Sequence, residues 1–218
     1  MQSVKGYLGT KITEIPDEIG IYAWYFSPNA QMHMSMDRVG TILANILNAP
    51  PSYKTVIGYR YGVRWESSGE LKMKSTNAKL GERAISEMIG GKQFLRSFMS
   101  EALVPCFSRP LYIGISKNVR NRVNNDHYKL LSNFWEPSSS VSKYLDTHKD
   151  ATVSDVMEAL SIKHSFSLEA RVRGININQL LVYVYPLLSS DILIKDEQEL
   201  SDLESVLQWL ADPVCGRA

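Results

Sequence analysis

The stretches IPDEIGIYAWYF at 15–26 and RPLYIGISKNVRNRV at 109–123 decide the fold of this chain. Each contains an apolar run rich in β-branched and aromatic residues, which predicts a strand. Alternate residues of a strand share a face, so Tyr22 should point the same way as the alternate aromatic residues of its strand. On the second strand Tyr112 should share a face with Gly114, and a glycine there leaves room for another group.

A short turn and a helix follow the second strand. Ser116 and Asn118 are good helix N-caps. The segment NVRNRV then predicts a helix with Val119 and Val123 on its inner face, and Arg122 lies on that helix. A strand, a tight turn and a helix that carries an arginine beside a strand tyrosine are typical of a functional site.

Three segments of the chain resemble the GIY-YIG nuclease superfamily: GIY at 20–22, YIGISKNVRNR at 112–122 and LESVLQWLADP at 203–213. In this family a glutamate on a late helix precedes a proline by nine residues, as Glu204 precedes Pro213 here. The resemblance implies an α+β fold, with a small three-stranded antiparallel sheet flanked by helices. It also implies a nuclease that hydrolyses phosphodiester bonds.

The resemblance implies roles for four residues. Tyr22 and Tyr112 would activate the attacking water and position the phosphate, although which tyrosine takes the proton stays open. Arg122 would stabilise charge on the phosphate, for which a guanidinium fork is suited. Glu204 would hold Mg²⁺ or Mn²⁺, because one carboxylate with water and substrate oxygens suits Mg²⁺. The competing interpretations are ordinary half-buried strand tyrosines and an exposed acid near a helix N-terminus.

His127 is a further candidate catalytic residue with an unusual spacing. Many relatives carry a histidine four residues after the arginine, where this chain has Asp126, and His127 is five residues after Arg122. On a regular helix five residues turn a side chain about 140° away. The alternative is a packed histidine on the inner face of the helix. A second departure is Gly216, at a position where the family often has an asparagine.

Length and composition are those of a globular protein. The 218 residues are 44% hydrophobic and 22% charged, and no apolar run approaches the roughly 18 residues of a membrane span. The N-terminus has no signal-peptide pattern, and the two cysteines, Cys106 and Cys215, form no disulfide or zinc pattern. We therefore expect a cytoplasmic protein with no membrane partner.

The net charge of +1 is unevenly distributed. Residues 27–108 hold ten Lys and Arg against six Asp and Glu, a balance of +4. The remainder holds fourteen against seventeen, a balance of −3. If the protein binds a polyanion such as DNA, residues 27–108 are the expected place.

The predicted compact core comprises 7–26, 109–129 and 178–218, with insertions at 27–108 and 130–177. The family normally joins its first two motifs by a short hairpin, so the long first insertion is a departure. We expect that insertion to be a helix and hairpin subdomain that binds nucleic acid, carried by the rigid core. The second insertion is expected to be helical.

The first insertion contains the clearest strand pattern. Alternating residues over 53–65, a turn at Ser67-Ser68-Gly69 and a second strand at 70–74 predict a hairpin with an apolar and a basic face. The alternative is the solvated face of an ordinary amphipathic hairpin. The candidate nucleic-acid contacts on the basic face are Arg60, Arg64, Lys72 and Lys74. Further candidates beside the second motif are Ser116, Asn118 and Arg120.

Other elements follow from periodicity and capping. Helices are predicted over 36–48, 81–103, 138–148 and 154–163. A third core strand is predicted at 178–186, and a last helix at about 196–211. The buried stripe of that helix should be Leu200, Leu203, Leu207 and Leu210.

We therefore expect a Mg²⁺-dependent endonuclease of the GIY-YIG type that acts on DNA, in restriction or in a mobile element. One alternative is a nucleic-acid-binding module with a degenerate nuclease core, which the spacing of His127 and the presence of Gly216 favour. Another is a nuclease for RNA or branched DNA. The target sequence and cut position are not readable from the residues, and a homodimer stays open.

Overall fold

The computed structural model describes residues 4–27, 52–57, 65–70, 109–187, 197–211 and 213–215. The chain divides into two compact units, Met34–Arg96 and the rest, Met1–His33 with Ser97–Ala218. Both strands and helices are present, so the fold is α+β, as the sequence predicts. Among the described residues no helix is long and apolar enough to cross a membrane.

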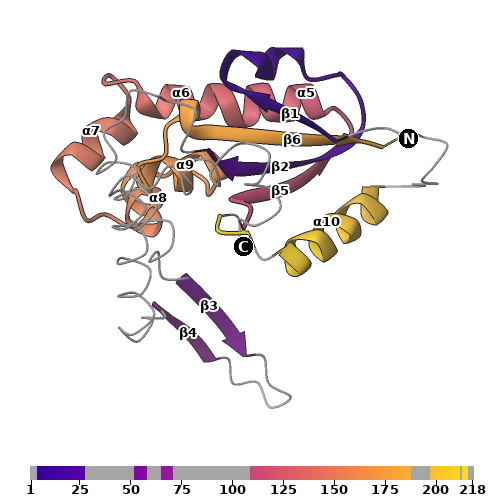
Figure 1. Ribbon diagram of the computed structural model, residues 1–218. Coiled ribbons are helices and arrows are strands. Elements are labelled where there is room, and N and C mark those ends of the chain that lie inside the picture. The colour runs from indigo at the N-terminus through magenta and orange to yellow at the C-terminus, as the bar shows by residue number, and fades with distance from the viewer. Residues whose placement is uncertain are drawn as a thin grey trace, which may run out of the picture. The chain divides into compact units, whose positions relative to one another are not determined.

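The larger unit is built on a four-stranded antiparallel sheet (Figure 1). Its strands are β1 Lys5–Leu8, β2 Gly20–Phe26, β5 Tyr112–Ser116 and β6 Leu180–Pro186, in the order β1-β6-β2-β5. The described sheet therefore has one strand more than the three expected, because the lead-in residues of β1 pair with β6. The 3-10 turns η1, Gly9–Glu14, and η4, Ile177–Gln179, precede β2 and β6.

The alternation predicted for β2 is confirmed. Gly20, Tyr22, Trp24 and Phe26 are buried, and the residues between them are only partly buried. β2 lies between β6 and β5, with Tyr22 opposite Gly114 in the register. The two stretches that carry the GIY and YIG triplets are thus neighbouring strands, although residues 23–111 separate them in the sequence.

A continuous helical rod follows β5 and covers the sheet (Figure 1). It consists of α5 Val119–Asn121, the π-helical segment η3 Arg122–Lys129 and α6 Leu130–Trp135. Its buried side chains recur every four residues and are Val119, Val123, His127 and Leu131. Gly20 allows the close approach, since a Cβ there would lie 3.1 Å from Val119 Cγ2 and 2.8 Å from a backbone oxygen.

Three further helices complete the second insertion, α7 Ser140–Thr147, α8 Val153–Leu160 and α9 Phe166–Val172. The sequence predicts the first two, and each has a side-chain cap at its N-terminus, from Ser139 and Thr152. The three helices share a small core of Val141, Val156 and Leu168. The sequence patterns do not predict α9.

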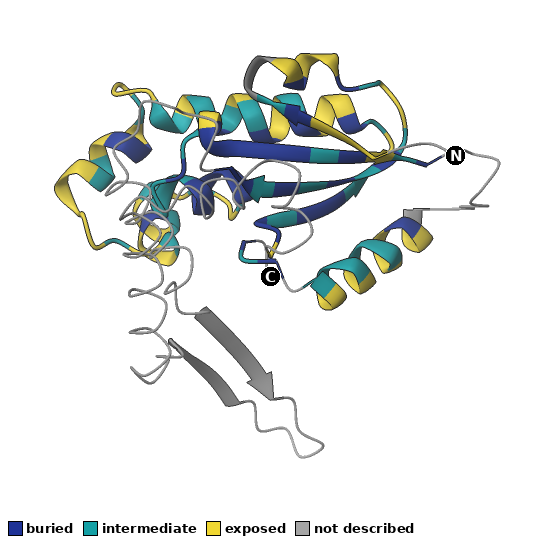
Figure 2. Cartoon of the chain, viewed as in Figure 1, coloured by how far each residue is buried: buried dark blue, intermediate teal, exposed yellow. Residues whose placement is uncertain are grey.

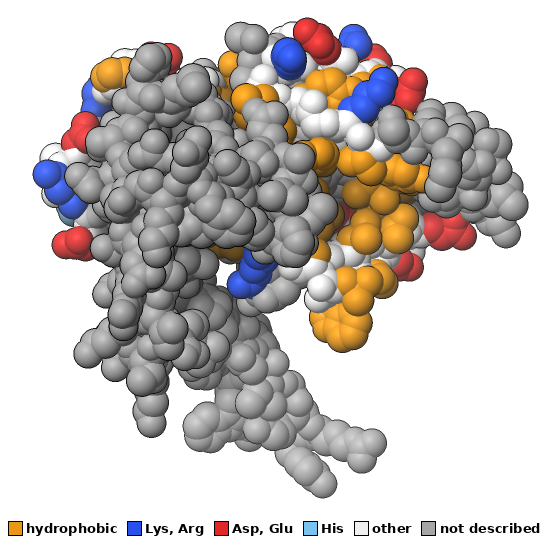
Figure 3. Space-filling model, viewed as in Figure 1, with side chains coloured by type: hydrophobic (Ala, Val, Ile, Leu, Met, Phe, Trp, Pro, Cys, Tyr) orange, Lys and Arg blue, Asp and Glu red, His pale blue; other side chains and the backbone are white. Residues whose placement is uncertain are grey.

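The last helix, α10 Glu197–Ala211, contacts β5 at the edge of the sheet (Figures 1 and 2). The predicted stripe is only partly right: Leu200 is buried and Leu210 is 67% exposed. Trp209 is 80% exposed, and hydrophobic side chains gather on this face (Figure 3). A short segment after α10 returns to the sheet, where Cys215 N–H donates to Leu111 O.

The smaller unit contains an antiparallel hairpin of β3 Ser52–Ile57 and β4 Trp65–Glu70. The hairpin itself agrees with the prediction, but the predicted position of its turn is wrong. Ile57 pairs with Trp65, so the two cannot belong to one strand, and Ser67-Ser68-Gly69 lies inside β4. The predicted helices at 36–48 and 81–103 lie outside the described residues.

Candidate functional site

Tyr22 and Tyr112 lie on one face of the sheet, with ring centroids 6.1 Å apart. Gly114 makes this possible because it sits directly opposite Tyr22. A Cβ at Gly114 would lie 2.6 Å from Tyr22 Cζ, closer than any real contact. The glycine of the YIG triplet therefore holds open the space that the tyrosine of the GIY triplet fills.

His127 joins the two tyrosines. Its Nε2 lies 2.9 Å from Tyr22 Oη, and its ring is 5.3 Å from the ring of Tyr112. The side chain is 4% exposed, and burial together with the positive charge of Arg122 lowers the pKa of His127 to about 3. His127 is therefore neutral at pH 7, and within the described residues its Nδ1 has no hydrogen-bond partner.

The helix geometry explains why a spacing of five residues reaches the site. Arg122 to Lys129 is π-helical, with hydrogen bonds from i to i+5 that widen the turn. A π-helix has more residues per turn than an α-helix, so two residues five apart point in more similar directions. The separation of about 140° that regular α-helical geometry predicts for Arg122 and His127 therefore does not apply here. His127 is both packed, as its alternative interpretation held, and in contact with Tyr22. π-helical segments within α-helices are frequent at functional sites.

Arg122 is shared between an exposed partner and the buried tyrosines. Its Nη1 donates to Asp126 Oδ2 at 2.9 Å, and both side chains are almost half exposed. It also interacts with both Tyr22 and Tyr112, through its charge and through hydrogen bonds. Burial would lower the pKa of Arg122, but the contact with Asp126 and the two tyrosines outweighs this and raises it, so the guanidinium is charged.

Burial shifts the tyrosines toward their neutral forms. It raises the pKa of Tyr22 well above the ordinary value, and it raises that of Tyr112 less. The nearby charge of Glu204 adds to both shifts, whereas Arg122 opposes them. Both phenols are therefore un-ionised at pH 7.

Glu204 reaches the same site from α10. The Tyr112 hydroxyl and the Ile115 backbone N–H are hydrogen-bonded to its carboxylate, and Arg122 is close enough to act through its charge. Half-burial nevertheless raises the pKa of Glu204 above the ordinary value. Among the described residues, Arg122 is the one cationic side chain that acts on the carboxylate of Glu204.

Gln208 is a site residue that the sequence patterns did not single out. Its Nε2 donates to Glu204 Oε1 at 3.0 Å and also to Ile113 O at 3.1 Å. It therefore fixes the Glu204 side chain and ties α10 to the edge strand. The i, i+4 spacing from Glu204 was the signal that could have revealed it.

Phe166 was also missed, and it forms the back wall of the site. Its ring lies 5.5 Å from Trp24, 5.4 Å from Tyr112 and 5.4 Å from His127. Ser167, the next residue on α9, donates from its hydroxyl to His127 O at 3.0 Å. The second insertion therefore supplies part of the site, which a division into core and insertion does not predict.

The residues present fit a single divalent cation of the Mg²⁺ type. Within the described ranges, no group of three or more His, Cys, Asp and Glu side chains is arranged to hold a metal. Mg²⁺ does not need such a group, because it retains several waters and is held by one or two carboxylates and substrate oxygens. Glu204, whose charge burial disfavours, is the carboxylate of this site that would gain from a cation.

The candidate contacts beside the second motif have local structural roles. Asn118 accepts from Asn121 N–H at 2.8 Å as the helix cap, and Ser116 donates from its hydroxyl to Asn118 O. Arg120 donates from Nε to Ile15 O at 2.6 Å. The four basic residues of the hairpin lie outside the described residues.

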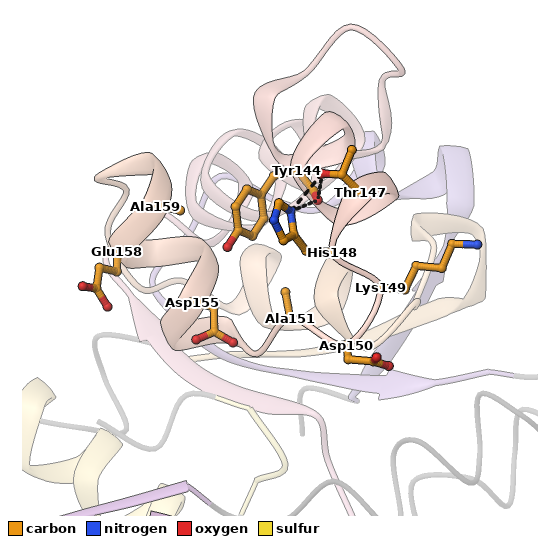
Figure 4. A pocket seen from close by; sticks show the side chains of 9 residues that line it. All are labelled: Tyr144, Thr147, His148, Lys149, Asp150, Ala151, Asp155, Glu158 and Ala159. Atoms are coloured by element: carbon orange, nitrogen blue, oxygen red, sulfur yellow. Dashed lines mark hydrogen bonds between the residues drawn. The ribbon is translucent and has the colours of Figure 1, made fainter.

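A surface hollow between α7 and α8 lies apart from these residues (Figure 4). Tyr144 and His148 stack on one another there, with ring centroids 4.3 Å apart. Its Asp155 is already engaged by Thr152 in the capping box of α8. The polar groups of this hollow therefore serve the local helices.

Comparisons of the chain with family models, with curated proteins and with solved structures found no match. The function of the site is therefore inferred from its own residues.

Proposed function

We propose that this chain is a Mg²⁺- or Mn²⁺-dependent endonuclease that hydrolyses DNA phosphodiester bonds in the manner of GIY-YIG nucleases. One observation carries the proposal: Tyr22, Tyr112, Arg122, His127 and Glu204 come from four elements, β2, β5, η3 and α10, and form one connected set of contacts. Ordinary sheet tyrosines and a solvated helix acid would not share one charged arginine and a buried neutral histidine.

Arg122 would bind the phosphate. Its partner Asp126 is an exposed i, i+4 neighbour, and such pairs contribute only about 0.3–0.5 kcal/mol. A phosphate could therefore displace Asp126 at little cost and receive the guanidinium fork. The buried tyrosines would keep the other side of the guanidinium in place.

Tyr22 would align the attacking water. Arginine can only donate, so Tyr22 Oη accepts from Arg122, and we assign the Tyr22 proton to the hydrogen bond with His127 Nε2. One lone pair of Tyr22 Oη then remains for a proton of the water. As the water attacks phosphorus, Tyr22 Oη accepts a hydrogen bond from it and the proton of the water passes to solvent, so His127 stays neutral and positions Tyr22.

Glu204 would hold the divalent cation, and Tyr112 and Gln208 would orient its carboxylate. When bound, the cation supplies Lewis acidity to a phosphate oxygen. The 3′ oxygen leaves as the phosphorus–oxygen bond breaks and takes a proton from solvent.

The alternative of a degenerate, binding-only core is less well supported. One of its two motives, the spacing of His127, is accounted for by the π-helical turn. The other, Gly216, lies outside the described residues. RNA or branched DNA as the substrate stays an outcome of the experiment below.

The proposal is tested by incubating supercoiled plasmid, RNA and a branched DNA with the protein, with Mg²⁺ or with EDTA. Glu204→Gln keeps the size of the side chain and removes its charge. We expect Mg²⁺-dependent cleavage to fall by about two orders of magnitude or more, as when other transition-state electrostatic groups are removed. Normal cleavage by this variant would remove Glu204 from the site, and no cleavage of any substrate by the wild type would refute the nuclease.

A further inference from the structure

The exposed surface of α5 and η3 carries a hydrogen-bonded row of side chains beside the candidate site. Asn121, Asn125 and Lys129 follow one another at i, i+4 spacing, and all three are exposed. Asn125 Nδ2 donates to Asn121 Oδ1, and Lys129 Nζ donates to Asn125 Oδ1 at 2.7 Å. We call these three residues the polar ridge.

The direction of these hydrogen bonds is fixed by Lys129. An ammonium group has three donors and no acceptor, so Asn125 must present its oxygen to Lys129. The amide nitrogen of Asn125 then faces Asn121, which must in turn present its own oxygen. Each amide oxygen already accepts one hydrogen bond within the ridge, and the remaining N–H groups of all three side chains are donors. A surface that offers donors and few acceptors suits a ligand made of acceptors.

Charge and position indicate the same kind of ligand. Residues 117–129 hold four Lys and Arg and one Asp, a balance of +3 with His127 neutral. Asn121 precedes Arg122 directly, so the ridge lies on the row next to the candidate phosphate-binding arginine. At the α-helical rise its length is at most about 12 Å, which matches about three phosphates of one DNA strand along the axis.

We propose that the polar ridge binds the phosphodiester backbone of the substrate strand next to the bond that is cut. The inference rests on the proposed nuclease function, because it places the strand by means of Arg122. The ridge would act by donating hydrogen bonds to phosphate oxygens, so it would contribute to affinity and register without reading the base sequence.

The test is Asn125→Asp, with binding of a fluorescein-labelled DNA duplex measured by anisotropy in EDTA. The new carboxylate still accepts from Lys129, so the melting temperature should stay near that of the wild type. It replaces an outward donor by a negative charge, and we expect the Kd to rise about tenfold. Asn178→Asp, at an exposed asparagine on η4, makes the same charge change and should leave the Kd within about twofold. Equal affinity of the two variants would overturn the proposal, since a merely structural row predicts that result.

A second variant measures the phosphate contact itself. Lys129→Gln should reduce the slope of log Kd against log salt by about one, whereas Lys143→Gln, at an exposed lysine of α7, should leave the slope unchanged. The same measurements on single-stranded DNA and RNA identify which phosphodiester is bound. Failure of the wild type to bind any of the three refutes the ridge. Binding that depends on Asn125 without cleavage by the wild type would keep the ridge and refute the nuclease.

Discussion

At the residue scale, one physical cause, burial, acts on the four titratable side chains that share the site with Arg122, which are Tyr22, Tyr112, His127 and Glu204. It raises the pKa of Tyr22, Tyr112 and Glu204 and lowers that of His127, so each is driven toward its uncharged form. Arg122 alone among these five has its charged form strengthened. Arg122 is therefore the charged donor that a phosphate would meet at this site.

The two tyrosines give the first prediction. Tyr22→Phe and Tyr112→Phe each remove one hydroxyl from a ring that stays packed, so the melting temperature should change by only a few degrees. Cleavage should fall by about two orders of magnitude for Tyr22→Phe, because the hydroxyl joins Arg122 to His127. The measurement is the single-turnover cleavage rate beside a thermal melt. Loss of stability with cleavage unchanged would show that the tyrosines only fill the core.

His127 gives a prediction about pH and stability. Its pKa is about 3 in the folded protein and about 6.5 when unfolded, so below pH 6.5 the unfolded chain binds the proton more readily. Stability is therefore fully present above pH 6.5 and is lost as pH falls toward 3, by about 2 kcal/mol at pH 5. The contribution of His164, whose pKa is raised by Glu169, has the opposite sign and is lost only as pH rises.

The measurement is urea unfolding between pH 7 and pH 5. His127→Gln removes the titrating group, so its stability should fall less over this range than that of the wild type. His148→Gln, at an exposed histidine, is the matched control. A wild type and a His127 variant with the same pH dependence would contradict the burial of a neutral ring.

At the scale of elements, α10 is held at the site by hydrogen bonds of Gln208, which we call the Gln208 clamp, rather than by a deeply buried apolar stripe. The stripe is weak, since of its four leucines only Leu200 is buried, and Leu210 is exposed. Gln208 compensates by bonding both Glu204 and the backbone of β5. Of the groups that hold this carboxylate, Gln208 is the one that also ties α10 to β5.

Gln208→Leu tests this clamp. The leucine keeps most of the volume but cannot donate, so Glu204 should lose its fixed orientation. We expect cleavage to fall about tenfold at saturating Mg²⁺ and the Mg²⁺ concentration for half-maximal rate to rise. Gln198→Leu is the matched control, because Gln198 makes the same i, i+4 bond to Asp202 on the same helix, away from the site. Equal effects of the two variants would mean that the bond serves only the helix.

The sequence predicts those parts of the fold and the site that follow from local periodicity or from helix caps. The facing of Tyr22 follows from strand alternation, and α7 and α8 follow from their caps, because these signals are local. The direction of the His127 side chain was predicted from the α-helical repeat of 3.6 residues, which does not hold in the π-helical segment η3. The sequence did not predict α9, because its place in the fold depends on contacts of Phe166 with the rings of Trp24, Tyr112 and His127, which are distant in the sequence.

Other misses have the same origin. β1 is only four residues long, and its strand character comes from pairing with β6 at the far end of the chain. The hairpin of 52–70 has two alternating runs, and alternation cannot indicate where a chain reverses. The strand β1 and the position of the hairpin turn are both determined by pairing between strands, which local propensity does not reveal.

At the scale of the whole molecule, the chain offers two candidate surfaces for nucleic acid, one in each unit. The polar ridge belongs to the unit that carries the site, and the hairpin belongs to the unit Met34–Arg96. The hairpin unit is the more basic, and it contains the residues expected to touch DNA: Arg60, Arg64, Lys72 and Lys74. Charge is now the reason for proposing these four residues, since the strand pattern that placed them on one face is wrong.

The last prediction separates the two surfaces. Replacing the four basic residues of the hairpin by alanine should weaken DNA binding and reduce the salt slope by about one for each phosphate that is no longer bound. The catalytic residues are untouched, so saturating DNA at low salt should restore cleavage, which Glu204→Gln would not allow. If one of the arginines reads a guanine edge, its single replacement should relax the target sequence, at about 1–3 kcal/mol of discrimination. An unchanged Kd and salt slope in the quadruple variant would exclude the hairpin, and the affinity for DNA would then have to come from the unit that holds Arg122 and the polar ridge.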